Sequence, residues 1–208
     1  VAAAPPLAPG QTVSAALDTP NAAVMYRFDG TAGDRFYLDQ FSATGGTVNW
    51  RVYDPFGNFV NGGNVGSFAN FTLMQLPYTG TYRLILDGNP SNVNATTYQF
   101  TAGIPAPRTT AITVGQVVTG TTTQPGQRND FTFTLAADTT LYIDPISTSD
   151  SWLTWGLTGP KGPLFTASRQ IYGNVTGFPL SDNAYVLPAG SYTLSVDNTS
   201  GRTTPFTF

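Results

Sequence analysis

Apolar and polar residues alternate with a period of two along much of this chain. In the segment Tyr192–Asp197 an apolar residue at every second position alternates with Thr, Ser or Asp. This spacing is typical of a strand with one face in a core and one in water. The same pattern predicts strands centred on residues 24–28, 36–41, 48–53, 131–135, 141–146 and 153–157. Many short strands separated by Gly, Pro, Asn and Asp favour an all-β sandwich or jelly-roll with almost no helix.

The pattern occurs twice. Gly10-Gln11 matches Gly115-Gln116, an offset of 105 residues (115 − 10), and the same offset carries Trp50 onto Trp155. The offset later becomes 110 (190 − 80), where Gly80 matches Gly190. We therefore predict two tandem β-sandwich (jelly-roll-like) domains, one at 10–103 and the other at 111–208. The Pro-containing stretches 1–9 and 104–110 are predicted as linkers.

Residues of equal parity in the predicted strands define the expected core of each copy. Trp50 shares parity with Val52, and Trp155 shares parity with Leu157, so both tryptophans are expected to point inward. The full expected core is Tyr26, Phe28, Trp50, Tyr82 and Leu84 in the first copy, and Phe131, Phe133, Trp155, Tyr192 and Leu194 in the second.

Charged residues are scarce in this chain, which limits the classes of partner that it can bind. Charged residues make up 10% of the chain, the formal net charge is −3, and the arginines are scattered. Nucleic-acid binding is therefore not expected. No apolar run approaches the ~18 residues of a membrane span, so membrane insertion is not expected either. Low charge, abundant Thr, Asn and Gly, and the lack of Cys suggest a secreted or surface-displayed bacterial protein, with any targeting signal outside this sequence.

Catalysis is disfavoured by what the composition lacks. The sequence contains no His, Cys or Glu, which removes the common general bases, the thiol nucleophile and most zinc ligand sets. Asp18-Thr19-Pro20 lacks the glycine of an aspartic-protease signature, and its counterpart in the second copy is Thr123. We therefore expect no enzyme activity and assign no catalytic residue.

Several short motifs together resemble one bacterial family. They are a Tyr-x-Phe strand at Tyr26, the Ala32-Gly33-Asp34 turn, a Pro-x-Gly turn at Pro55, and Gly80-x-Tyr82-x-Leu84. This combination resembles the pre-peptidase C-terminal domain, and the likeness is closer in the first copy. The resemblance implies small jelly-roll-like sandwiches attached to secreted peptidases or repeated along large exoproteins, where they have accessory roles. Some members of that family hold calcium.

Oxygen-rich loops make calcium the one cofactor to consider. Asp, Asn and backbone carbonyls suit Ca²⁺, and some aspartates recur in both copies. Hydrogen bonds at turns and strand ends are the favoured explanation of the same residues, because no Asp-x-Asp-x-Asp spacing is present. The candidate metal ligands are Asp34, Asp39, Asp87, Asp144 and Asp197.

Aromatic residues in predicted loops are candidates for ligand binding, because a rigid apolar ring can stack on a sugar face. They are Phe56, Phe59, Tyr78, Trp152, Tyr172 and Phe178. The chain is thus expected to be a non-catalytic structural or adhesive module that neighbours other domains of one polypeptide. The alternative is a carbohydrate- or matrix-binding module that targets an attached secreted enzyme to polysaccharide or matrix protein.

Overall fold

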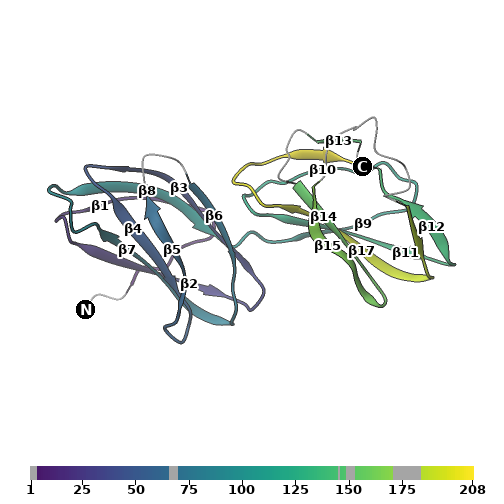
Figure 1. Ribbon diagram of the computed structural model, residues 1–208, viewed down its shortest axis with the longest axis horizontal. Coiled ribbons are helices and arrows are strands. Elements are labelled where there is room, and N and C mark those ends of the chain that lie inside the picture. The colour runs from purple at the N-terminus through teal and green to yellow at the C-terminus, as the bar shows by residue number, and fades with distance from the viewer. Residues whose placement is uncertain (1–3, 66–69, 145, 149–152, 171–183) are drawn as a thin grey trace. The chain divides into compact units, whose positions relative to one another are not determined.

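The computed structural model describes residues 4–65, 70–144, 146–148, 153–170 and 184–208. Over these ranges the regular secondary structure is all β-strand, which confirms the predicted all-β class. The chain divides into two compact units, Val1–Pro105 and Ala106–Phe208 (Figure 1). Within the described part of the chain, no helix has the length and apolarity that a membrane crossing requires.

The first unit contains two four-stranded antiparallel sheets, with strand orders β2-β7-β4-β5 and β1-β8-β3-β6. The strands of the first sheet are β2 (Ala23–Gly30), β7 (Gly80–Gly88), β4 (Val48–Tyr53) and β5 (Phe59–Val65). Those of the second are β1 (Gln11–Leu17), β8 (Thr96–Gly103), β3 (Arg35–Thr44) and β6 (Asn70–Gln75).

Aromatic contacts between these two sheets form the core of the first unit. Phe28 of β2 stacks on Phe36 of β3 with ring centroids 4.0 Å apart. The hydroxyls of Tyr26 and Tyr98 share a buried 2.8 Å hydrogen bond. Burial raises the pKa of Tyr98, and the hydrogen bond with Tyr26 raises it further. Two antiparallel sheets packed on one apolar core fit a β-sandwich.

The second unit is also built of β-strands around its own core, in three sheets ordered β15-β14-β17-β11-β9, β10-β18-β13 and β12-β16. The largest sheet contains β15 (Gly162–Gln170), β14 (Leu153–Gly159), β17 (Gly190–Asn198), β11 (Arg128–Leu135) and β9 (Arg108–Ala111). The others contain β10 (Thr119–Thr121), β18 (Pro205–Thr207), β13 (Ser147–Thr148), β12 (Thr139–Tyr142) and β16 (Ala184–Leu187).

The same core contacts recur in the two units. Phe28 stacks on Tyr82 at 5.4 Å with 14° between the ring planes, and Phe133 stacks on Tyr192 at the same distance and angle. The predicted core is confirmed, because none of its ten residues is more than 8% exposed. The alternating pattern of the sequence therefore predicted the inward-facing residues correctly.

Parts of the two stretches that were predicted as linkers pair with sheet strands. Leu7 is buried in the first core, and its NH donates to the carbonyl of Arg27 at 2.8 Å. Its counterpart Ile112 donates likewise to Thr132 at 2.9 Å, directly after β9. Residues 5–7 and strand β9 thus lie parallel to β2 and β11, respectively, at a sheet edge. Proline is tolerated at a sheet edge, where the NH that it lacks is not needed.

Candidate binding surface

The β4–β5 hairpin of the first unit has a turn fixed by one buried carboxylate. Oδ1 of Asp54 accepts hydrogen bonds from the NH groups of Phe56 and Asn58, both at 2.8 Å. Its Oδ2 accepts from Nδ2 of Asn58 at 3.0 Å. Burial acts to raise the pKa of Asp54, but these hydrogen bonds outweigh burial and hold the pKa below its usual value. The turn therefore presents Phe56 in a defined position.

Two of the predicted ligand-binding aromatics meet beside this turn. Phe56 and Tyr78 pack edge to face, with ring centroids 5.2 Å apart and an interplanar angle of 86°. Phe56 is 73% exposed and Tyr78 is 47% exposed, so the pair is largely in water. We call these two residues the tip pair. Exposed, mutually supported rings of this kind are suited to stacking on an apolar face of a ligand.

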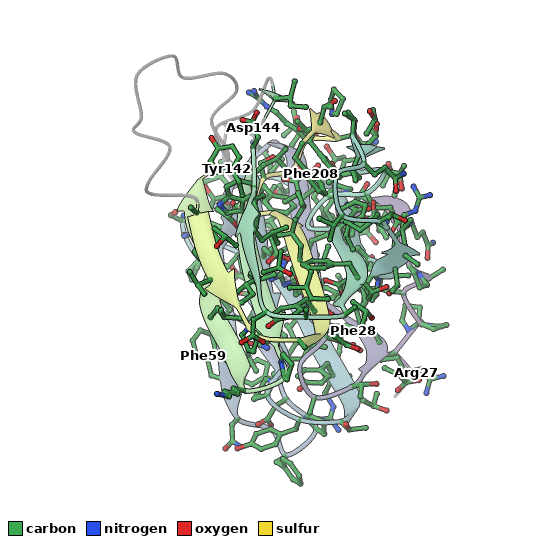
Figure 2. All side chains as sticks on the ribbon, turned by 90° about the vertical axis from the view of Figure 1, so that its right-hand side faces the viewer. Arg27, Phe28, Phe59, Tyr142, Asp144 and Phe208 are labelled. Atoms are coloured by element: carbon green, nitrogen blue, oxygen red, sulfur yellow. The ribbon has the colours of Figure 1, made fainter. Side chains whose placement is uncertain are left out.

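A third predicted aromatic, Phe59, belongs to a row of side chains that crosses the β2-β7-β4-β5 sheet. The register places Arg27 opposite Arg83, Arg83 opposite Tyr53, and Tyr53 opposite Phe59. These four residues form the outer row. The rings of Tyr53 and Phe59 pack edge to face at 6.1 Å. Figure 2 labels Arg27 of β2 and Phe59 of β5, the first and last strands in the order β2-β7-β4-β5.

The two arginines of the outer row are exposed and lie side by side. Like charges directly opposite one another on antiparallel strands are destabilising. Within the described residues, neither Arg27 nor Arg83 forms an ion pair. The outer row therefore offers two uncompensated guanidinium groups next to two aromatic rings, which suits a ligand with anionic groups and apolar ring faces.

The second unit does not repeat this surface. Thr132, Thr193 and Thr158 lie opposite one another where the first unit has Arg27, Arg83 and Tyr53. At the offset of 105, Phe56 corresponds to Lys161 and Phe59 to Leu164. The outer row and the tip pair are therefore special to the first unit.

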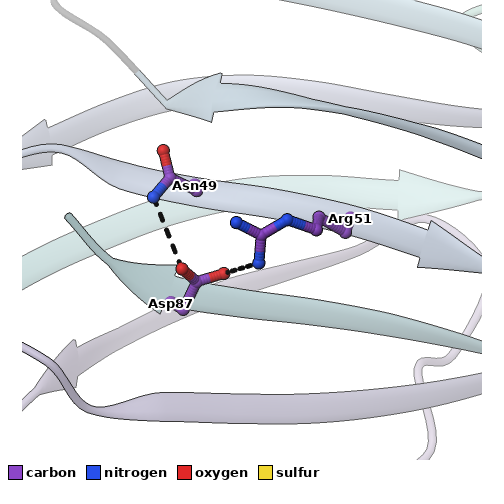
Figure 3. A network of polar contacts seen from close by, with 3 residues as sticks. All are labelled: Asn49, Arg51 and Asp87. Carbon is purple, nitrogen blue, oxygen red and sulfur yellow. Dashed lines mark hydrogen bonds and ion pairs between the residues drawn. The ribbon is translucent and has the colours of Figure 1, made fainter. Parts of the chain in front are cut away.

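The predicted metal ligands of the first unit are spread over different surroundings. Oδ2 of Asp34 accepts the NH of Thr31 at 2.8 Å and so closes a turn. Asp39 lies within β3, where burial raises its pKa. Asp87 pairs with Nη1 of Arg51 at 2.6 Å and accepts from Asn49 at 3.4 Å (Figure 3).

In the second unit, Asp144 is exposed, whereas Asp197 is buried with 2% of its surface accessible. Across the described ranges, no group of three or more His, Cys, Asp or Glu side chains gathers in a way that could hold a metal. Calcium binding by Asp34, Asp39, Asp87, Asp144 or Asp197 stays a prediction. Three predicted aromatics, Trp152, Tyr172 and Phe178, lie outside the described residues.

Sequence reasoning missed Arg27, Arg83 and Tyr53. A signal for their exposure was available, because each lies one position away from an inward-facing residue such as Tyr26 or Tyr82. The sequence could not predict that these three residues lie close together. A period of two assigns each residue to one face of a strand, but it does not show which strands are neighbours in the sheet.

No protein-family model matches the chain, and no curated protein matches it in sequence. Among solved structures, the chain is similar to tripeptidyl peptidase 2, at 9% identity and a TM-score of 0.35, over 99% of this chain and 24% of that chain. It is also similar to the glycoside hydrolase domain of Endo-D from Streptococcus pneumoniae, at 10% identity and a TM-score of 0.28, over 95% of this chain and 33% of that chain. The chain thus spans about a quarter to a third of the length of these proteins. Similarity at these TM-scores carries no argument about function.

Proposed function

We propose that this chain is a non-catalytic structural and adhesive module of a larger secreted or surface protein, built of two tandem β-sandwich domains. The observation that carries the proposal is the pair of separate cores with matching contacts, Phe28 on Tyr82 and Phe133 on Tyr192. A unit with its own core can be repeated along a polypeptide. The resemblance to pre-peptidase C-terminal domains favours the same accessory role outside a bacterial cell.

A second function, carbohydrate binding, is favoured by the outer row and the tip pair. Exposed rings stack on sugar faces, and paired guanidinium groups recognise carboxylates or sulfates. The ligand class that fits both is an acidic polysaccharide. This surface would make the first unit the adhesive part and the second unit a structural part.

A binding experiment with the full chain tests the adhesive role. The chain is applied to an array of neutral and acidic glycans and to matrix proteins, and saturable binding to an acidic glycan is the expected result. Phe56→Ala and Arg83→Met should each weaken that binding at least about tenfold, the equivalent of about 1.4 kcal/mol. Leu164→Ala and Arg202→Met are matched controls, because they remove an exposed apolar and an exposed cationic side chain from the second unit.

The outcomes separate the two roles. Binding that survives both first-unit substitutions contradicts the assigned surface. Binding to none of the glycans or matrix proteins contradicts adhesion and leaves only the structural role. Turnover of a peptide, ester or glycoside that a single Asp→Asn substitution abolishes would contradict the non-catalytic assignment.

A further inference from the structure

Asn61 and Gly62 of strand β5 have a geometry that favours a chemical change of their own backbone. Asn61 is the only asparagine of the sequence that is followed by glycine. The NH of Gly62 donates to Oδ1 of Asn61 at 2.8 Å, so the side chain of Asn61 is folded back on the next peptide bond. Cγ of Asn61 lies one C=O bond of ~1.2 Å from Oδ1, which limits the distance between Cγ and the nitrogen of Gly62 to about 4 Å. A nitrogen nucleophile and a carbonyl carbon are therefore held close together.

Packing around Phe59 favours glycine at position 62. A Cβ on Gly62 would lie 2.9 Å from the carbonyl oxygen of Trp50 and 3.1 Å from the ring of Phe59. A side chain at this position would therefore displace Phe59 or the backbone of β4. The lack of a side chain also leaves the nitrogen of Gly62 open to approach by Cγ of Asn61. The contact that positions Phe59 in the outer row thus requires the residue that makes the dipeptide reactive.

Two neighbouring asparagines lack this combination and serve as internal controls. Asn64 is exposed, but it is followed by Val65, whose branched side chain hinders approach to the backbone nitrogen. Asn58 is followed by Phe59, and its Nδ2 donates to Asp54 at 3.0 Å. Asn61 itself is partly exposed, so that water reaches it.

We propose that Asn61 is a site of spontaneous deamidation in the folded chain. The nitrogen of Gly62 attacks Cγ of Asn61 and forms a bond to it. The proton of the Gly62 NH passes through solvent to Nδ2 of Asn61, and the bond from Cγ to Nδ2 breaks as ammonia leaves. Water then opens either carbonyl of the cyclic succinimide, which gives aspartate or isoaspartate at position 61. The net reaction consumes one water molecule, releases one ammonia and requires no oxidant or reductant.

Isoaspartate at position 61 would disturb the pairing of β5 with β4. The main chain then runs through the former side chain and is longer by one methylene group. Beyond this point Val65 pairs with Val48 and is buried in the first core with 2% of its surface exposed. The isoaspartate form should therefore be less stable than the unmodified chain. Both products also place a new negative charge two residues from Phe59. Weaker binding of an acidic polysaccharide would follow only if the function proposed above is correct, whereas the deamidation does not depend on it.

Incubation of the folded full chain at mildly alkaline pH, followed by peptide mass spectrometry and enzymatic detection of isoaspartate, tests the site. We expect isoaspartate to form at position 61 at least about tenfold faster than at position 64. The rate should rise with pH, because the attacking nitrogen must lose its proton. Asn61→Gln keeps an amide but moves its carbonyl carbon one methylene group farther away, so it should abolish the fast reaction and leave Asn64 unchanged. The isoaspartate form, separated by anion exchange, should melt at a lower temperature.

Equal rates at positions 61 and 64 in the folded chain would overturn the proposal. Isoaspartate that forms at position 61 only after urea unfolds the chain would also overturn it, because the fold would then protect the dipeptide. A rate that does not change with pH would contradict attack by the nitrogen of Gly62. An isoaspartate form that melts together with the unmodified chain would overturn the effect assigned to β5.

Discussion

The hydroxyl of Tyr82 donates a 2.6 Å hydrogen bond to the carbonyl oxygen of Tyr78 and accepts the NH of Tyr78 at 3.0 Å. This double contact fixes the loop before β7 to the core ring below it. In the second unit Tyr192 donates to the carbonyl of Pro188 at 2.7 Å, but proline has no NH to return. The tyrosine hydroxyl thus makes two hydrogen bonds to this loop in the first unit, which carries the exposed tip pair, and one in the second unit.

Removing these hydroxyls should affect the two units unequally. Tyr82→Phe keeps the stacking on Phe28 and loses two hydrogen bonds, so we expect a loss of about 1–2 kcal/mol in the free energy of unfolding. Tyr192→Phe loses one bond and should cost about 0.5–1.5 kcal/mol. Urea denaturation followed by circular dichroism measures both. A larger loss for Tyr192→Phe would contradict the stronger contact in the first unit.

Gly80 should resist substitution for two separable reasons. Its φ of 147° is rarely adopted by residues with a side chain, and a Cβ would lie 2.7 Å from Cγ of Pro55. We expect Gly80→Ala to destabilise the chain by about 1–3 kcal/mol. Adding Pro55→Ala should recover part of that loss, because it removes the closer contact with Cγ, while the 2.9 Å contact with Cβ of residue 55 and the backbone strain remain. If the double variant is no more stable than Gly80→Ala, contact with Pro55 does not contribute to the destabilisation. Gly190 and Pro160 offer the same test in the second unit.

The sequence predicted which side chains face the core better than it predicted which strands lie next to one another. Alternation placed Trp50 and Trp155 inside correctly, because burial leaves a period of two. It could not show that Arg27 lies opposite Arg83, since the pairing of β2 with β7 joins segments that are far apart in sequence. Asp-Gly is a dipeptide that favours tight turns, but Asp87 and Gly88 end strand β7. Their backbone pairs with β4, and such long-range pairing overrides a local turn preference.

Calcium binding through Asp87 should be negligible. The carboxylate is already held by Arg51 at 2.6 Å, and the two side chains are 22% and 43% exposed. A native-state ligand must raise the melting temperature. We therefore expect Asp87→Asn to leave unchanged any difference between the melting temperatures in excess calcium and in chelator. A higher melting temperature in calcium, lost in Asp87→Asn, would contradict this expectation.

Arg51→Met, which removes the ion pair with Asp87, should lower the free energy of unfolding by at most about 1 kcal/mol, and high salt should reduce that loss.

Asp54 should make the β4–β5 turn sensitive to acid. Its side chain is 2% exposed, and burial alone would raise its pKa, but the hydrogen bonds from Asn58, Phe56 and Gly57 lower the pKa below the usual value. Because the folded pKa lies below the unfolded one, the carboxylate stabilises the fold above about pH 4. That contribution is lost as the pH falls through the folded pKa.

Melting temperatures between acidic and neutral pH test this directly. Asp54→Asn should melt below the unsubstituted chain at neutral pH, because an amide cannot replace a carboxylate that accepts on both oxygens. The gap should narrow below about pH 4, where protonation weakens the native turn as well. Asp18→Asn, at an exposed position, is the control and should leave the melting temperature unchanged throughout. A gap that persists unchanged in acid would mean that Asp54 acts through its shape alone and not through its charge.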